Sequence, residues 1–198
     1  FKPLGMEHTF FLEKSGQVIK NRAVGYQKEG EETEFTQNHF FNFAAAGDGR
    51  LQITLDDFIK WMQNFNDSKI GKPNFVAQLV ERGVENDGDI MSYALGLEYG
   101  PFAGFNSYGH NGYWASNSSF FLRFPHPDIS IVVFSNNSTV SSTRKTFQAA
   151  EILLGDKQPK ELPESLVDKP TSARTTAQLN QWTGDYILYK TGYLRKIL

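Results

Sequence analysis

The sequence contains no cysteine among its 198 residues. Disulfide bonds, thiolate metal ligands and a cysteine nucleophile are therefore excluded. The absence leaves the cellular compartment open, because many exported bacterial enzymes also lack cysteine.

Long apolar runs are also missing. The longest apolar stretch in a strand-like segment is Ile-Val-Val-Phe at residues 131–134, far short of the roughly 18 residues that a membrane helix needs. The chain begins with Phe1 and has no signal-like apolar core near its start. We expect no membrane-spanning segment, and we expect the natural N-terminus and any targeting signal to be absent from this sequence.

An excess of one charge is missing as well. Lys and Arg number 20 and Asp and Glu number 22, so the formal net charge is −2. Nucleic-acid-binding surfaces need a basic excess, and no nucleic-acid partner is expected. His8, His39 and His126 do not have the spacing of metal ligands, and no carboxylate cluster accompanies them. We therefore expect neither a metal nor another cofactor.

What the sequence does have is a hydrophobic fraction of 39%. This is enough for one globular core, or for one domain and a fragment of another. Prolines among Lys, Glu, Ser and Thr mark residues 156–176 as an interdomain linker. We divide the chain into a domain over residues 1–155, this linker, and the start of a truncated second domain over residues 177–198. The aromatic and apolar residues of the last segment predict one or two strands, too few for a core.

Helical periodicity occurs in three places. Thr54 is a candidate N-cap, and Asp57 follows three residues later as in a capping box. Apolar residues at helical spacing predict an amphipathic helix over residues 54–65. Two further helices are predicted over residues 74–85 and 142–154. Ser142 is the expected N-cap of the last helix, which should end at Gly155.

Strand patterns account for most of the remaining chain. Short extended pieces are predicted over residues 10–12, 17–19 and 22–26. After Asp89, four strands are predicted over residues 93–99, 105–113, 118–124 and 129–135. A turn at residues 125–128 separates the last two, and short loops favour an antiparallel meander. The expected fold class is α+β, a largely antiparallel sheet flanked by helices, in an incomplete domain.

Four segments carry short motifs in a fixed order. They are Pro-Leu-Gly-Met-Glu-His-Thr-Phe at residues 3–10, then residues 47–58, residues 93–99, and Tyr-Gly-His-Asn-Gly-Tyr at residues 108–113. These segments resemble, in the same order, four segments of the class C β-lactamase, D-alanyl-D-alanine peptidase and esterase family. That family's patterns are Pro-Leu-Gly-Met-x-x-Thr-x-Phe, Gly-x-Gly-Gly-Leu-x-Ser-Thr-x-x-Asp-Leu, Tyr-Gly-Leu-Gly and Gly-His-x-Gly. The resemblance covers residues 2–154 and implies a penicillin-binding-protein-type transpeptidase fold.

The resemblance implies a serine hydrolase that transfers acyl groups from an amide, an ester or a β-lactam. The substrate would be a small molecule or peptidoglycan-like, and the location periplasmic or cell-envelope. In the family, a Ser-x-x-Lys motif supplies the nucleophile and a Tyr-x-Asn loop assists proton transfer. Both motifs precede the Pro-Leu-Gly-Met segment, so this C-terminal half is expected to lack the nucleophile and to be inactive alone. The alternative is a non-catalytic homologue that acts as a binding or structural module.

The fourth segment implies the site residues. His110 takes the position of the family's lysine or histidine and is the expected catalytic residue. Asn111, Gly112 and Tyr113 are the expected substrate-binding residues. Asn111 departs from the usual Thr or Ser, Gly112 lets a substrate backbone approach closely, and the N–H of Tyr113 would be one oxyanion-hole donor. Without the resemblance, a lone histidine in a strand is usually a hydrogen-bonded structural residue.

Several other patterns are interpreted as unrelated to catalysis. Ser-x-x-Lys at residues 142–145, Ser-x-Asn at residues 135–137 and Lys-Thr-Gly at residues 190–192 occur in the wrong order for the family. Asp56 and Asp57 are interpreted as helix-capping residues, and residues 86–89 as a polar turn. Because N-terminal elements would complete the sheet, the chain should expose an apolar face and dimerise through it.

Overall fold

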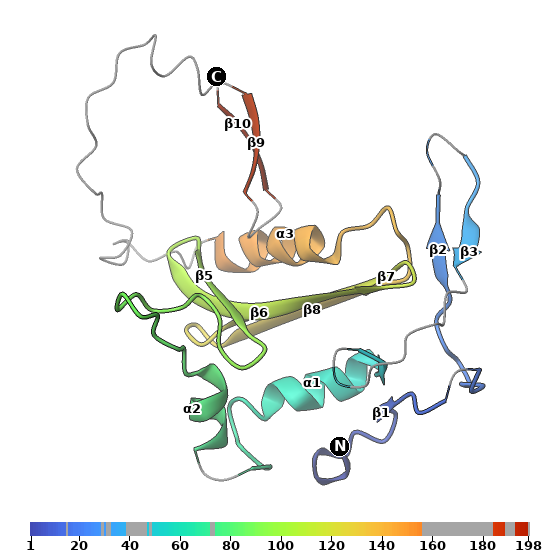
Figure 1. The fold of residues 1–198 in the computed structure, drawn as a ribbon, viewed down its shortest axis with the longest axis horizontal. Coiled ribbons are helices and arrows are strands. Elements are labelled where there is room, and N and C mark those ends of the chain that lie inside the picture. Colours follow the sequence, from blue (N-terminus) through green and yellow to red (C-terminus); the bar gives the residue numbers. More distant parts are fainter. Residues whose placement is uncertain are drawn as a thin grey trace.

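An antiparallel four-stranded sheet forms the centre of the molecule (Figure 1). The computed structural model describes residues 1–14, 16–28, 30, 33–38, 47, 49–71 and 74–155, and the backbone of residues 184–188 and 193–197. The sheet has the order β5-β6-β7-β8, with β5 at Glu98–Phe102, β6 at Phe105–Trp114, β7 at Asn117–Phe124 and β8 at Ile129–Ser135. The predicted meander and the α+β fold class are confirmed.

A helix covers each face of this sheet. Side chains alternate along β7, and Phe120, Leu122 and Phe124 form the buried core with Phe147 and Leu154 of α3 (Ser142–Leu154). On the opposite face, Phe121 meets Phe58 of α1 (Leu55–Gln63), with 5.4 Å between ring centroids. The sheet therefore lies between α3 and α1, as Figure 1 shows.

Both long helices begin with a capping serine or threonine. The Thr54 hydroxyl accepts a hydrogen bond from the N–H of Asp57, as predicted for α1. The N-cap of α3 is Ser141, whose hydroxyl accepts from the N–H of Arg144. The prediction of Ser142 as this N-cap was wrong. Its side chain is buried and bonds the hydroxyl and the carbonyl oxygen of Ser118 on β7.

Two elements before β6 are shorter than the sequence patterns predicted. Helix α2 spans Phe75–Val80 and ends where Glu81 becomes extended, so the prediction of a helix to residue 85 was wrong. Residues 93–99 do not form one strand. Tyr93 pairs with Glu98 in an isolated bridge, and Gly96 between them has a φ of +78°, which turns the chain before β5 begins.

The turn between β7 and β8 is held by buried Arg123. Its guanidinium donates to Asp128 and to Ser130, each at 2.8 Å, and also to Asn66. The hydrogen bonds from Arg123 and Asn66 hold the pKa of the Asp128 carboxyl below its usual range. The predicted turn at residues 125–128 is therefore tied to the segment that follows α1.

Short two-stranded pairs make up the N-terminal region. Strand β1 (Phe10–Phe11) pairs with β4 (Leu51–Gln52), and β2 (Gly25–Gln27) pairs with β3 (Thr36–Asn38). A 3₁₀ turn at Lys2–Leu4 precedes them. The extended piece predicted over residues 17–19 is not a strand, and Val18 is 94% exposed, so it has no packing partner.

At the C-terminus, β9 (Gly184–Leu188) pairs antiparallel with β10 (Tyr193–Ile197). These two strands agree with the one or two predicted there. The proposed linker over residues 156–176 lies outside the described residues, and the division into domains stays a prediction. Of the helices in the described part of the chain, none has the length and apolar character needed to cross a membrane.

Candidate active site

The four predicted site residues lie in the second half of β6, where one strand edge is open. Strand β5 pairs with β6 only as far as Gly109, whereas β7 pairs with β6 to Trp114. Among the residues that the structure describes, no strand pairs with the β5-side edge of β6 from His110 onward. Such an edge presents unpaired backbone N–H and C=O groups, which an extended ligand can use as a template.

The side chains of the four residues divide between the two faces of the sheet. His110 is opposite Phe121 and Gly112 is opposite Ser119, so both positions lie on the α1 face. Asn111 and Tyr113 point to the α3 face, because side chains alternate along a strand. Tyr113 is 64% exposed. The structure therefore brings these residues together through their shared backbone edge and separates their side chains.

Both ring nitrogens of His110 have hydrogen-bond partners. The Nδ1 atom lies 2.6 Å from the carbonyl oxygen of Asn111, and Nε2 lies 2.9 Å from the hydroxyl of Tyr93. A carbonyl oxygen only accepts, so Nδ1 carries a proton, and in the neutral imidazole the Tyr93 hydroxyl then donates to Nε2. The Tyr93 ring meets the imidazole edge-on, with 5.8 Å between centroids.

A cavity of about 170 Å³ opens beside His110. Its walls are mainly aromatic; besides His110 they are formed by Phe58, Asn111, Ser119, Phe120, Phe121 and Phe134. Phe58 packs edge-on against Phe134 at 5.7 Å between centroids. The sequence did not identify the aromatic wall residues or Tyr93 as site residues. They come from α1, from β7, from β8 and from the segment before β5, and these elements meet only in the folded domain.

Two glycines let β6 approach β7 closely. A Cβ atom at Gly109 would lie 2.0 Å from the carbonyl oxygen of Phe121, and one at Gly112 would lie 2.7 Å from Ser119 Oγ. Glycine at these positions therefore serves packing within the sheet. The predicted role of Gly112 in admitting a substrate backbone stays a prediction.

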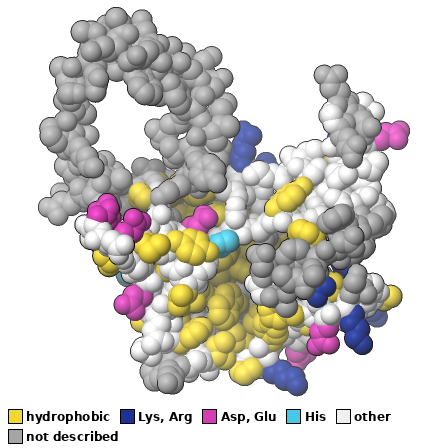
Figure 2. Space-filling model, in the orientation of Figure 1, with side chains coloured by type: hydrophobic (Ala, Val, Ile, Leu, Met, Phe, Trp, Pro, Cys, Tyr) yellow, Lys and Arg dark blue, Asp and Glu magenta, His cyan; other side chains and the backbone are white. Residues whose placement is uncertain are grey.

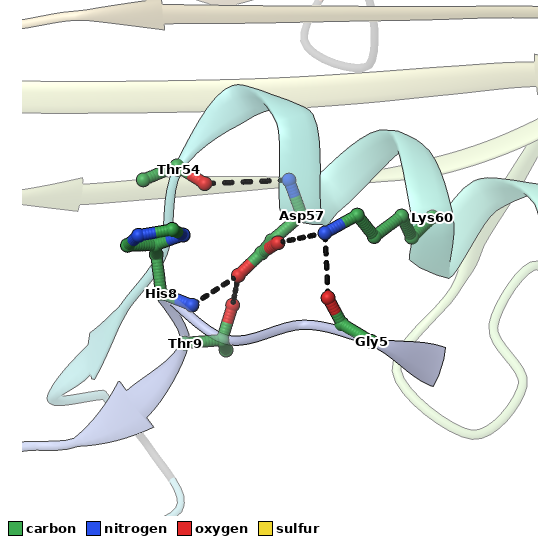
Figure 3. A network of polar contacts seen from close by, with 6 residues as sticks. All are labelled: Gly5, His8, Thr9, Thr54, Asp57 and Lys60. Atoms are coloured by element: carbon green, nitrogen blue, oxygen red, sulfur yellow. Dashed lines mark hydrogen bonds and ion pairs between the residues drawn. The ribbon is translucent and has the colours of Figure 1, made fainter. Parts of the chain in front are cut away.

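The Pro-Leu-Gly-Met segment is tied to α1 by Asp57 (Figure 3). The fully buried carboxylate accepts from the N–H of His8 at 2.7 Å, from the Thr9 hydroxyl at 2.8 Å and from Lys60 Nζ at 2.7 Å. Burial raises the pKa of Asp57, but the hydrogen bonds from Lys60, Thr9 and His8 outweigh it and hold the pKa below its ordinary value. The carboxylate is thus occupied by donors that fix the fold.

The other motif matches do not assemble a second site. Ser142 is buried against Ser118, and Lys145 is exposed on α3. Lys190 to Gly192 lie outside the described residues. Within the described ranges, no group of three or more His, Asp or Glu side chains is placed to hold a metal ion.

These observations define a class of protein: a mixed α/β domain in which an antiparallel sheet presents a His-x-Gly strand at an open edge. The family model described as Beta-lactamase matches residues 1–154, and the chain belongs to this family of serine β-lactamases and penicillin-binding-type proteins. No curated protein matches the chain.

Two solved structures share the fold. The octameric penicillin-binding protein homologue from Pyrococcus abyssi has 23% identity and a TM-score of 0.65, with 100% of this chain and 43% of that chain covered. The penicillin binding protein from Bacillus halodurans has 19% identity and a TM-score of 0.61, with 77% of this chain and 46% of that chain covered. This chain therefore spans less than half the length of either protein.

Proposed function

We propose that this chain supplies the histidine wall of a serine hydrolase that acts by acyl transfer on an amide, an ester or a β-lactam. The observation that carries the proposal is the position of His110. It lies where the edge of β6 is no longer paired with β5, and it lines a cavity. Acyl transfer needs oriented N–H donors for the developing oxyanion and a hydrogen-bonding group for proton transfer. In this structure the open backbone edge of β6 and the imidazole of His110 lie side by side.

In this proposal the residues of the edge have distinct roles. The N–H of Tyr113 is one oxyanion donor, Gly112 leaves room for the substrate backbone, and Asn111 replaces the hydroxyl residue that would meet a substrate carboxylate. The serine, its lysine partner and the Tyr-x-Asn loop come from a segment outside these 198 residues. The substrate is a small molecule or peptidoglycan-like, and the family resemblance suggests the periplasm or the cell envelope as the location.

Labelling with a fluorescent penicillin, followed by mass spectrometry, tests the proposal. The 198-residue chain alone should form no covalent adduct, whereas a natural protein that contains these residues and a preceding Ser-x-x-Lys segment should be labelled. An adduct on the chain alone, on Ser119 or Ser142 for example, would overturn the assignment of the nucleophile. A longer protein with both motifs that never forms an adduct would overturn the proposed reaction.

The role of His110 is tested in that longer protein. We expect His110→Ala to lower the acylation rate by roughly 10²–10³, the usual effect of removing one positioned donor, with little change in melting temperature. His8→Ala is a matched control, because the His8 side chain is exposed and only its N–H bonds Asp57. A variant His110→Ala that melts earlier, while its folded molecules react normally, would show a structural histidine instead.

A non-catalytic binding module is the second candidate. The observation that favours it is Asn111, which stands where the family pattern has Thr or Ser. This candidate predicts saturable, reversible penicillin binding by the longer protein without a covalent adduct. The same labelling experiment therefore separates the two functions.

A further inference from the structure

The Tyr93 hydroxyl is the hydrogen-bond partner of Nε2 in the His110 ring. Tyr93 is 41% exposed and its hydroxyl is 2.9 Å from Nε2 of His110. The other ring nitrogen is held by the Asn111 carbonyl at 2.6 Å. We propose that Tyr93 is a positioning residue, which holds His110 in one orientation and in the neutral tautomer that is protonated at Nδ1.

The backbone around Tyr93 is held firmly enough for this role. Tyr93 pairs with Glu98 across a tight turn. The N–H of Ala94 bonds the carbonyl of Leu97 at 2.9 Å, and the N–H of Tyr99 bonds the carbonyl of Ser92 at 2.8 Å. Leu97 is only 3% exposed. The turn thus lies beside Glu98, which is itself opposite Gly109 of β6, and from there the Tyr93 hydroxyl reaches the next residue, His110.

The hydrogen bonds to Asn111 and to Tyr93 both favour the same tautomer of the His110 ring. The carbonyl of Asn111 selects a proton on Nδ1, and the Tyr93 hydroxyl then donates to the lone pair of Nε2. The edge-on ring contact, at an interplanar angle of 73°, restrains rotation about the bond to the imidazole. A ring held in this way has one defined acceptor nitrogen, Nε2, and that nitrogen is bonded to the Tyr93 hydroxyl.

The consequence for catalysis rests on the proposed acyl transfer, but the positioning itself does not. If His110 takes part in proton transfer, the Tyr93 hydroxyl is its immediate hydrogen-bond neighbour, and Nε2 reaches a substrate only through that hydroxyl or after it moves. Removing the hydroxyl while keeping the ring should therefore change the protonation pattern of His110 without unfolding the sheet.

Nuclear magnetic resonance of the 198-residue chain with ¹⁵N-labelled histidine tests this positioning. The His110 signals are assigned by their loss in His110→Gln. We expect a single neutral tautomer with the proton on Nδ1 and an Nε2 resonance shifted by an accepted hydrogen bond. In Tyr93→Phe, the Nε2 resonance should move toward that of a free acceptor, and the second tautomer should become populated.

Tyr99→Phe is the matched control. It removes a phenol hydroxyl from the neighbouring strand that bonds the Val80 carbonyl at 2.6 Å, and it should leave the His110 nitrogens unchanged. A wild-type His110 protonated on Nε2, or His110 nitrogens unmoved in Tyr93→Phe, would overturn the inference. Either result is independent of penicillin labelling, so failure of the positioning and failure of the proposed function are distinguishable.

Discussion

At the scale of single residues, the carboxylate of Asp57 connects two distant segments. Its position three residues after Thr54 predicted a helix cap, and the Thr54 hydroxyl does accept from its N–H. The side chain itself accepts from Thr9, 48 positions earlier in the chain. Local spacing predicts a cap because a cap involves neighbouring residues. It contains no information about a donor on another segment.

Replacing Asp57 should make the free energy of unfolding depend less on pH in the acidic range. We expect Asp57→Asn to lower the free energy of unfolding at neutral pH by about 1.5–3 kcal/mol, as for hydrogen bonds to a charged group. Since the folded pKa of Asp57 lies below its ordinary value of 3.8, its stabilisation is present above that value and is lost as the pH falls through the folded pKa.

Denaturant unfolding at neutral pH and at about pH 3 measures this effect. The difference between wild type and Asp57→Asn should shrink at the lower pH. Asp56→Asn is the control, because Asp56 is exposed on the same helical turn, and it should change stability little at either pH. A difference that stays constant with pH would show that the charge of Asp57 contributes nothing.

At the scale of elements, the local patterns predicted β7, β8 and α3 to within about one residue at either end, as expected for strong periodicity and clear turns. The prediction was wrong where a turn interrupts a strand-like pattern. Residues 93–99 are mostly apolar, as in a buried strand, yet Gly96 at a φ of +78° turns the chain. The sequence pattern shows only which side chains are apolar. The turn depends on backbone pairing between Tyr93 and Glu98, which the pattern does not specify.

The close contact of β6 with β7 predicts different effects for two glycine variants. Gly109→Ala would place a Cβ 2.0 Å from the Phe121 carbonyl oxygen, a backbone atom that cannot move alone, and should cost about 1–3 kcal/mol or more. Gly112→Ala would meet the Ser119 hydroxyl at 2.7 Å, which can rotate away. Thermal unfolding of both variants should give a clearly larger loss for Gly109→Ala, and equal losses would contradict this packing.

At the scale of the whole molecule, the sheet is covered on both faces, but α1 keeps apolar side chains exposed to solvent. An exposed apolar face was predicted from the sequence, because N-terminal elements of the domain would be missing. The structure shows α1 over that face, with Leu55 47% and Ile59 43% exposed. Figure 2 shows hydrophobic side chains gathered over the region of α1. An apolar cluster of this kind favours association.

We expect the isolated chain to self-associate through α1 and to bind a hydrophobic dye. Leu55→Lys with Ile59→Lys should weaken self-association at least about tenfold, because burial of one such side chain contributes about 1.5–3 kcal/mol. Analytical ultracentrifugation measures the change. Ile152→Lys on α3 is the control, since Ile152 is 82% exposed on the other side of the sheet. A monodisperse wild-type monomer that binds no dye would contradict the prediction.

The sequence by itself determined the class of fold, because apolar periodicity and turn residues are local and select helices and strands one at a time. It also determined the position of His110 on a strand, and the order of its motifs identified the family. Only the tertiary structure decided which groups meet: Tyr93 with His110, and Asp57 with Thr9. Each of these contacts joins residues from different elements, and its geometry depends on strand register and helix docking, which no local pattern specifies.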